Sequence, residues 1–184
     1  PLWGEAGGSK EEGRGNTRRQ TYAAMVTSMD EGIGKILPAL KEAGLEDNTL
    51  VLFQSDNGAE PNAGGSSGAL KGEKFQEWDG GVRSAAVIRW PAGFKGGWKN
   101  EQLCSYIDVL PTLCAVAGVS TTPAKKLDGI NILPSLKDKK TIDRELFLGH
   151  GSLIAGDWKL VKANSGNEKM KHTDDVLYNI VTDP

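Results

Sequence analysis

The chain contains the run Thr49-Leu50-Val51-Leu52-Phe53-Gln54-Ser55-Asp56-Asn57-Gly58, an apolar stretch that ends in a polar turn. The apolar part is continuous rather than alternating, which predicts a central strand covered on both faces. In open α/β sheets, ligands bind at the carboxyl ends of strands, and neighbouring oxygen ligands suit a hard divalent cation such as calcium or magnesium. Asp-Asn-Gly is also a common turn sequence, so the turn in isolation leaves both interpretations open.

Two further segments follow this strand at short spacing. They are residues 70–74, Leu-Lys-Gly-Glu-Lys, and residues 78–83, Trp-Asp-Gly-Gly-Val-Arg. Both lie in a stretch between Asn57 and Gly81 that is rich in glycine and serine and too long for a simple connection. Long loops inside compact domains are usually functional. A lysine in this loop is suited to bind an anion held by a metal ion.

The segments around the loop predict alternating helices and strands. From residue 21 to residue 43, apolar side chains recur at three- and four-residue spacing, which predicts an amphipathic helix that ends at Gly44. Residues 85–90 predict a second apolar strand, and residues 103–107 a short third one. Asp108 is a suitable N-cap for a following helix that closes at a glycine ten residues later.

The last third of the chain shows a different pattern. Residues 121–140 are expected to be mostly loop. Short apolar runs then follow at residues 146–148, 158–161 and 176–179, with turn residues between them. This spacing predicts a small antiparallel sheet packed beside the main one.

Composition restricts the class of protein. With 38% hydrophobic and 25% charged residues, the 184-residue chain has the composition of a globular protein. A formal net charge of −2 provides no basic field, which argues against nucleic acid as a partner. No stretch approaches the about 18 apolar residues of a membrane span. Cys104 and Cys114 are expected to be buried free thiols, the first in a strand and the second on a helix.

Several of these motifs, in this order, resemble the sulfatases of the alkaline-phosphatase superfamily, with the arylsulfatases, including the arylsulfatase B-like group, as nearest kin. A set of short motifs in the right order is more specific than any one motif. The matching segments are residues 22–26, 29–30, 56–58, 78–83 and 108–113, with weaker matches at 127–129, 156–161 and 177–180.

The resemblance implies a fold class, which is α/β. We expect an alkaline-phosphatase-like sandwich represented by the later strands of its main sheet, with a small C-terminal antiparallel sheet. Residues 1–140 would be the C-terminal part of the sulfatase catalytic domain, and residues 141–184 a truncated antiparallel subdomain. The family's Cys-x-Pro-x-Arg or Ser-x-Pro-x-Arg segment, whose Cys or Ser becomes formylglycine, does not occur in this sequence. We therefore expect the chain to be the C-terminal part of a sulfatase.

The resemblance also assigns roles to individual residues. Asp56 and Asn57 would be metal ligands, and Lys74 would be the catalytic lysine that contacts the sulfate of the substrate. Its neighbour Lys71 is expected to be a solvated surface lysine. Three residues of the second motif are expected to serve as scaffold: Trp78, Asp79 and Arg83. Gly80 and Gly81 are expected to let the backbone adopt angles closed to other residues, and Arg83 to tie the loop down through an ion pair. The two histidines are expected to be surface or packing residues: His150 and His172.

The function implied by the resemblance is hydrolysis of sulfate monoesters. One divalent metal ion, calcium first and magnesium as the alternative, would act with a formylglycine nucleophile that lies outside this chain. The substrate would be a sulfated small molecule or a sulfated glycan, and the location extracytoplasmic. Two alternatives stay open at this point: a phosphomonoesterase or phosphodiesterase of the same superfamily, and a non-catalytic binding domain derived from a sulfatase.

Overall fold

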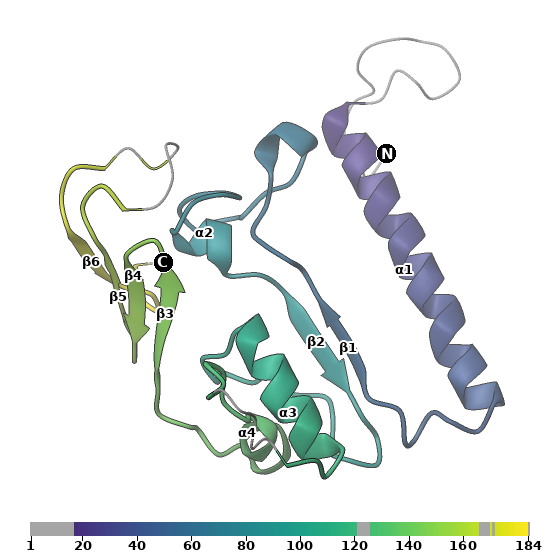
Figure 1. The fold of residues 1–184 in the computed structure, drawn as a ribbon. Helices are drawn as coiled ribbons and strands as arrows, with labels where there is room; N and C mark the ends of the chain where they lie inside the picture. Colours follow the sequence, from purple (N-terminus) through teal and green to yellow (C-terminus); the bar gives the residue numbers. More distant parts are fainter. Residues whose placement is uncertain (1–16, 121–125, 166–169, 171, 184) are drawn as a thin grey trace.

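The computed structural model describes residues 17–120, 126–165, 170 and 172–183. Helices and two separate antiparallel sheets make up this part of the chain (Figure 1). One sheet has two strands, β1 and β2, and the other has four, in the order β3-β4-β5-β6. No helix among the described residues is long and apolar enough to cross a membrane. The α/β class expected from the sequence is confirmed.

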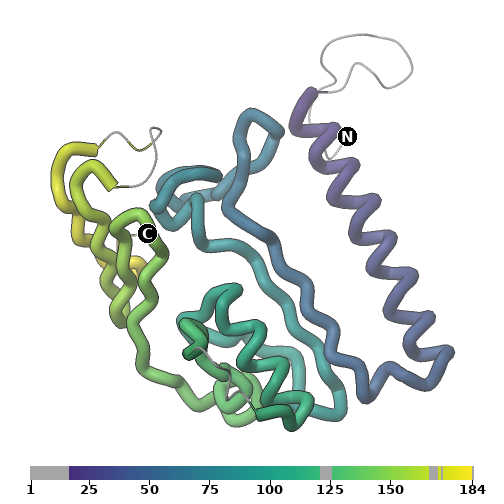
Figure 2. The backbone as a smooth tube through the Cα atoms, viewed as in Figure 1, coloured from purple at the N-terminus to yellow at the C-terminus, as the bar shows by residue number. Residues whose placement is uncertain are grey.

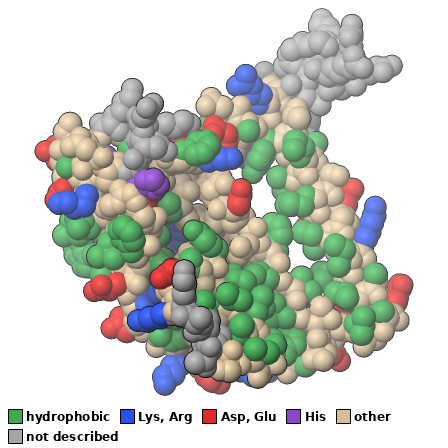
Figure 3. Space-filling model, viewed as in Figure 1, with side chains coloured by type: hydrophobic (Ala, Val, Ile, Leu, Met, Phe, Trp, Pro, Cys, Tyr) green, Lys and Arg blue, Asp and Glu red, His purple; other side chains and the backbone are tan. Residues whose placement is uncertain are grey.

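The first element is the long helix α1, Arg18–Glu42, which agrees with the helix predicted from the apolar spacing. Thr17 caps it through a reciprocal capping box with Gln20, which satisfies two backbone N–H groups at the helix start. Figure 3 shows hydrophobic side chains along α1 and across the centre of the same view. Several large apolar residues of α1 are exposed in the described structure: Tyr22, Met25, Val26, Met29 and Ile36.

Strands β1, Val51–Gln54, and β2, Ala86–Arg89, form an antiparallel ribbon. Its register pairs Val51 with Arg89 and Gln54 with Ala86. The expected central strand covered on both faces is wrong for this part of the chain. Among the described residues β1 pairs with β2 alone, and its apolar residues are only half-buried, because no second layer of described residues covers them.

The segment after β2 forms short helices. They are the 3₁₀ helix η2, Tyr106–Asp108, the helix α3, Val109–Val116, and the helix α4, Leu133–Asp138. The helix predicted after Asp108 is confirmed. The strand expected at residues 103–107 is wrong, because Asp108 accepts the N–H of Ser105 at 2.8 Å and closes a 3₁₀ turn instead. Residues 126–140 are mostly loop, as expected, and contain the short helix α4; residues 121–125 of the expected loop lie outside the described residues.

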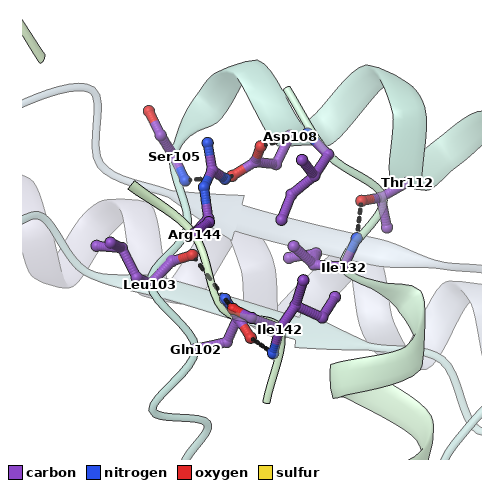
Figure 4. A network of polar contacts seen from close by, with 9 residues as sticks. Gln102, Leu103, Ser105, Asp108, Thr112, Ile132, Ile142 and Arg144 are labelled. Atoms are coloured by element: carbon purple, nitrogen blue, oxygen red, sulfur yellow. Dashed lines mark hydrogen bonds and ion pairs between the residues drawn. The ribbon is translucent and has the colours of Figure 1, made fainter. Parts of the chain in front are cut away.

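Figure 4 shows the buried polar network that ties these helices to the last third of the chain. Asp108 is 1% exposed and pairs with Arg144 at 2.6 Å, with the side chain of Arg144 8% exposed. The second oxygen of Asp108 accepts the N–H of Ile130 at 2.8 Å. Nearby, the Gln102 amide both donates to and accepts from the backbone of Ile142. The carboxylate that begins α3 is therefore a junction between three segments.

The C-terminal sheet follows this network. It comprises β3, Glu145–Gly149, β4, Ser152–Ala155, β5, Trp158–Val161, and β6, Val176–Asn179. The antiparallel sheet predicted from the sequence is confirmed, with β4 as an additional strand. It packs on Trp78, which shares a buried cluster with Val161 and Met170. Figure 2 shows the chain around Trp78 lying between the ribbon and this sheet.

The two cysteines are free thiols, as expected. Their expected burial is wrong, because Cys104 is exposed in a loop and Cys114 is half-buried on α3. The ribbon, the loop between its strands and the C-terminal sheet remain as the parts of the fold that position the candidate site.

Candidate active site

The Asp56–Asn57 pair lies in the turn that immediately follows β1. Ser55 donates its N–H to the carbonyl of Ala85 at 2.9 Å, which continues the ribbon for one residue beyond the strand. The Ser55 hydroxyl then donates to the carbonyl of Asn57 at 3.0 Å and fixes the turn. The Asp56 side chain is exposed and forms no hydrogen bond or ion pair with any described residue. It is therefore a free carboxylate on a fixed turn.

The next residue, Gly58, touches the second motif by its backbone. Its N–H donates to the carbonyl of Gly81 at 2.8 Å, and a Cβ atom at Gly58 would lie 1.8 Å from the carbonyl oxygen of Gly80. Real Cβ atoms do not approach so closely, so only glycine fits here. The Asp-Asn-Gly turn and the short helix α2, Asp79–Val82, are thus in direct contact.

The glycine pair of the second motif serves a different purpose from the one expected. Gly80 and Gly81 are helical residues of α2 and neither has a positive φ, so the expected use of angles closed to other residues is wrong. A Cβ atom would lie 2.2 Å from the carbonyl oxygen of Gly72 at Gly80, and 2.1 Å from that of Gln76 at Gly81. These glycines are required by close backbone packing. We call Gly58, Gly72, Gly80 and Gly81 the glycine interlock.

Lys74 lies beside the turn because of a backbone contact. Its N–H donates to the carbonyl of Ala59 at 2.8 Å. The Lys74 ammonium lies 5.3 Å from the ring of Phe75 and pairs with no acid among the described residues. Phe75 has a φ of 74°, which is an uncommon conformation for a bulky residue and marks strain at this point. The structure therefore brings the segments of all three predicted site residues together.

The described residues alone do not make up a metal site. No group of three or more His, Cys, Asp or Glu side chains occurs among residues 17–120, 126–165, 170 and 172–183 in a position to hold a metal ion. Asp56 and Asn57 supply two oxygen-bearing side chains. Calcium takes six to eight oxygen ligands, so the chemistry of these donors fits a hard cation while their number does not fill its shell.

Behind the glycine interlock, the second motif is anchored to the C-terminal sheet. Asp79, 2% exposed, pairs with the fully buried ammonium of Lys159 at 2.9 Å. Tyr178 donates its hydroxyl to the same carboxylate at 3.2 Å. Arg83 lies 3.8 Å from Asp79 and confirms the expected ion pair. Sequence reasoning missed Lys159 altogether, since the contact joins residues eighty positions apart; a charged residue inside an apolar strand was the available signal.

Burial dominates the electrostatics of this anchor. Desolvation lowers the pKa of Lys159, and the carboxylate of Asp79 opposes that change by hydrogen bonding and charge. Desolvation, followed by the charge of Asp79, raises the pKa of Tyr178. The raised pKa keeps the Tyr178 hydroxyl protonated at neutral pH, as a hydrogen-bond donor to Asp79.

Trp78 packs against two residues that were given no catalytic role from the sequence, Lys71 and His172. The Lys71 ammonium lies 3.8 Å from the centre of the Trp78 ring, a cation–π contact, so this lysine packs on the scaffold. The His172 ring lies 5.3 Å from that of Trp78 and donates its Nε2–H to the Lys162 carbonyl. His172 is thus a packing residue, and His150 is exposed.

These features define a candidate site in an α/β fold, in which the turn after β1 and the loop that carries Lys74 are joined by backbone contacts beside closely packed glycines. A family model with the description Sulfatase matches residues 4–119. The chain therefore belongs to the sulfatase family.

Named relatives agree with this assignment. The chain is similar to N-acetylgalactosamine-6-sulfatase of Homo sapiens, with 36% identity over 144 residues, covering 76% of this chain and 28% of that protein. It is also similar to steryl-sulfatase of Homo sapiens, with 33% identity over 150 residues, covering 77% of this chain and 26% of that protein. The chain thus spans little more than a quarter of the length of these relatives.

Solved structures show the same fold. The crystal structure of Ps i-CgsB in complex with k-i-k-neocarrahexaose matches with a TM-score of 0.78 and 31% identity, over 92% of this chain and 38% of that chain. A Bacteroides thetaiotaomicron structure whose title concerns metabolism of glycosaminoglycans matches with a TM-score of 0.70 and 26% identity, over 85% and 38%. The expected fold class is confirmed by these neighbours.

Proposed function

We propose that this chain forms part of the catalytic domain of a sulfatase that hydrolyses sulfate monoesters. The observation that carries the proposal is the glycine interlock, which fixes a free carboxylate and a free ammonium on adjoining segments. Unpaired charges of opposite sign on adjoining segments of fixed backbone suit the binding of a cation and the anion that accompanies it. Membership of the sulfatase family supports a sulfate ester as that anion.

In this proposal Asp56 and Asn57 each provide one oxygen to a divalent cation. Calcium is proposed first, because adjacent carboxylate and amide oxygens are common calcium ligands, and magnesium is the alternative. A bound cation supplies Lewis-acid polarisation of the sulfate oxygens. Its remaining ligands come from outside this chain, and so does the formylglycine nucleophile that the family resemblance implies.

Lys74 is proposed to bind the sulfate directly. Its ammonium is a compact positive charge without an acidic partner among the described residues. The backbone N–H of Lys74 bonds to the carbonyl of Ala59, the residue after the Asp56–Gly58 turn, which we call the metal turn. Charge that moves onto sulfate oxygens in the transition state is stabilised by such a positioned cation.

The substrate class is proposed from the names of the relatives. One relative at 36% identity is named for N-acetylgalactosamine 6-sulfate, and one structure at 31% identity contains a neocarrahexaose. A sulfated glycan is therefore proposed, and a sulfated small molecule is the alternative because a steryl-sulfatase matches at 33%. An extracytoplasmic location is proposed on the family resemblance.

The test uses a sulfatase that contains this chain, assayed with an aryl sulfate. Asp56→Ala should abolish turnover and reduce bound calcium, because no neighbour replaces the lost carboxylate. Lys71→Ala is the matched control, since its ammonium contacts the Trp78 ring rather than the site, and turnover should change little. Equal losses from both variants would show that the site is misplaced.

The same assay separates the alternatives. Hydrolysis of an aryl phosphate in preference to the sulfate would favour the phosphoesterase. Binding of a sulfated glycan without turnover would favour the non-catalytic domain. The 184-residue chain alone should be inactive, and turnover by it that survives Asp56→Ala would overturn the proposal.

A further inference from the structure

Lys159 is a charged residue in the interior of the C-terminal sheet. Its side chain is 0% exposed, and its ammonium lies 2.9 Å from Asp79 Oδ1, with that side chain 3% exposed. Desolvation of a buried charge is costly, and a pair of apolar residues of similar volume is often equally stabilising. The pair is therefore poorly explained by stability alone. What it does provide is one defined position for Asp79 relative to the sheet.

We propose that Lys159 is a positioning residue of the candidate site, which acts through Asp79 on the glycine interlock and thereby sets the spacing between the metal turn and Lys74. This role rests on the proposed sulfatase site. It adds to that proposal a part for the C-terminal sheet, which contributes no residue to the metal turn or to the lysine loop.

The path from Lys159 to the site runs through backbone contacts. Asp79 is the first residue of α2, so its carboxylate fixes the start of this short helix. Gly80, the next residue, donates its N–H to the carbonyl of Lys71 at 2.7 Å, on the loop that leads to Lys74. Gly81 accepts the N–H of Gly58 at 2.8 Å, directly behind the metal turn. Two consecutive residues of α2 thus hold the two halves of the site.

These contacts leave little room for movement. The carbonyl oxygen of Gly80 lies 1.8 Å from the position that a Cβ of Gly58 would occupy, and it also accepts the hydroxyl of Ser67 at 2.8 Å. Closely packed backbone transmits a displacement instead of absorbing it. A shift of α2 toward or away from the sheet therefore moves Gly58 and the loop before Lys74 together.

The sheet holds the segment that leads into α2 at further points. Tyr178 of β6 donates its hydroxyl to Asp79 at 3.2 Å, and Ser152 of β4 donates its hydroxyl to Glu77 at 2.5 Å. Both Ser152 and Glu77 are buried. Three strands of one sheet therefore contact residues 77–79 by polar side chains. These hydrogen bonds are directional, so they fix the orientation of the segment more than they add buried surface area.

Amide hydrogen exchange of the 184-residue chain tests this role without reference to activity. Lys159→Gln keeps a hydrogen-bond donor but removes the charge that holds Asp79. We expect the amides of Gly58, Gly80 and Lys74, whose N–H groups form the contacts described above, to exchange about tenfold faster or more. The amide of Ile130, bonded to Asp108 in the other network, should keep its rate.

Ile154→Ala is the matched control. Ile154 is paired with Lys159 across β4 and β5 and is 7% exposed, so its truncation weakens the same sheet without removing a polar contact to Asp79. It should accelerate exchange in the sheet and leave Gly58 and Lys74 unchanged. Equal acceleration of the site amides in both variants would overturn the inference, because Lys159 would then support only the stability of the sheet.

A second variant covers the case in which Lys159→Gln does not fold. Tyr178→Phe removes the other donor to Asp79 without unpairing a charge, and the same site amides should exchange about threefold faster. No change at those amides would overturn the inference. An inactive wild-type sulfatase with the expected exchange pattern would instead overturn the proposed function and leave the positioning contact standing.

Discussion

Asp108→Ala is expected to be the most destabilising substitution outside the candidate site. The carboxylate accepts three hydrogen bonds, from Arg144 at 2.6 Å and from the N–H groups of Ser105 and Ile130 at 2.8 Å each. Its removal leaves a guanidinium that is 8% exposed without its partner. Removing one member of a buried pair costs about 3–5 kcal/mol, a large share of the about 5–15 kcal/mol that stabilises a domain.

Urea unfolding followed by tryptophan fluorescence measures this loss as a lower midpoint at an unchanged slope. Asp108→Asn should lose less, because its amide oxygen still accepts one of the backbone N–H groups. The control is Glu101→Ala, which breaks an ion pair with Lys99 whose side chains are 73% and 78% exposed and should cost about 1 kcal/mol or less. Similar midpoints for Asp108→Ala and Glu101→Ala would refute the reasoning.

Three further predictions concern other parts of the chain. In a sulfatase that contains it, Lys74→Ala should lower turnover on the order of a hundredfold at constant metal content, whereas joint loss of metal and turnover would indicate a structural role. Gly58→Ala should lower the free energy of unfolding by about 1–3 kcal/mol through overpacking, seen as a lower urea midpoint, while Gly96→Ala, with nothing within 4 Å of the added Cβ, should leave the midpoint unchanged. The pKa of Asp175 is lowered, most by the hydrogen bond from the N–H of Ala163 and next by the hydrogen bond from the Lys162 ammonium. The contribution of Asp175 to stability is therefore present above the unfolded pKa of about 3.9 and is lost as pH falls through the lower folded pKa. The gap in thermal midpoint between wild type and Asp175→Asn should therefore be constant from neutral pH to about pH 5 and narrow below pH 4; a constant gap at pH 2 would contradict it.

Local signals in the sequence predicted most of the elements. The spacing of apolar residues predicted α1, the runs around Phe53 and Val87 predicted the two strands β1 and β2 but not their pairing as a separate ribbon, and the turn residues predicted strands of the C-terminal sheet. The strand expected at residues 103–107 failed because a side chain three residues away, that of Asp108, closes a competing turn. The strand propensity of residues 103–107 takes no account of the hydrogen bond from Ser105 to Asp108.

The candidate site was also predicted from the sequence only in part. The family motifs predicted Asp56, Asn57 and Lys74 as site residues, and the structure brings their segments together through backbone contacts. The role expected for Gly80 and Gly81 was wrong because close approach between backbones depends on segments that meet only in the folded chain. Lys159 was missed for the same reason, since its partner lies on a different element and no periodic pattern links the two.

The attachment of the C-terminal sheet also sets the order in which the site is completed during synthesis. A ribosome makes the chain from the N-terminus, so Asp56, Lys74 and Asp79 emerge long before their support. The donor from β6, Tyr178, is 99 residues downstream of Asp79. Until that strand has been made, a nascent chain carries the Asp-Asn-Gly turn without the contact of Tyr178 to Asp79. A truncation just before Tyr178 would remove no proposed ligand, and on the positioning role inferred above it would alter the geometry of that turn.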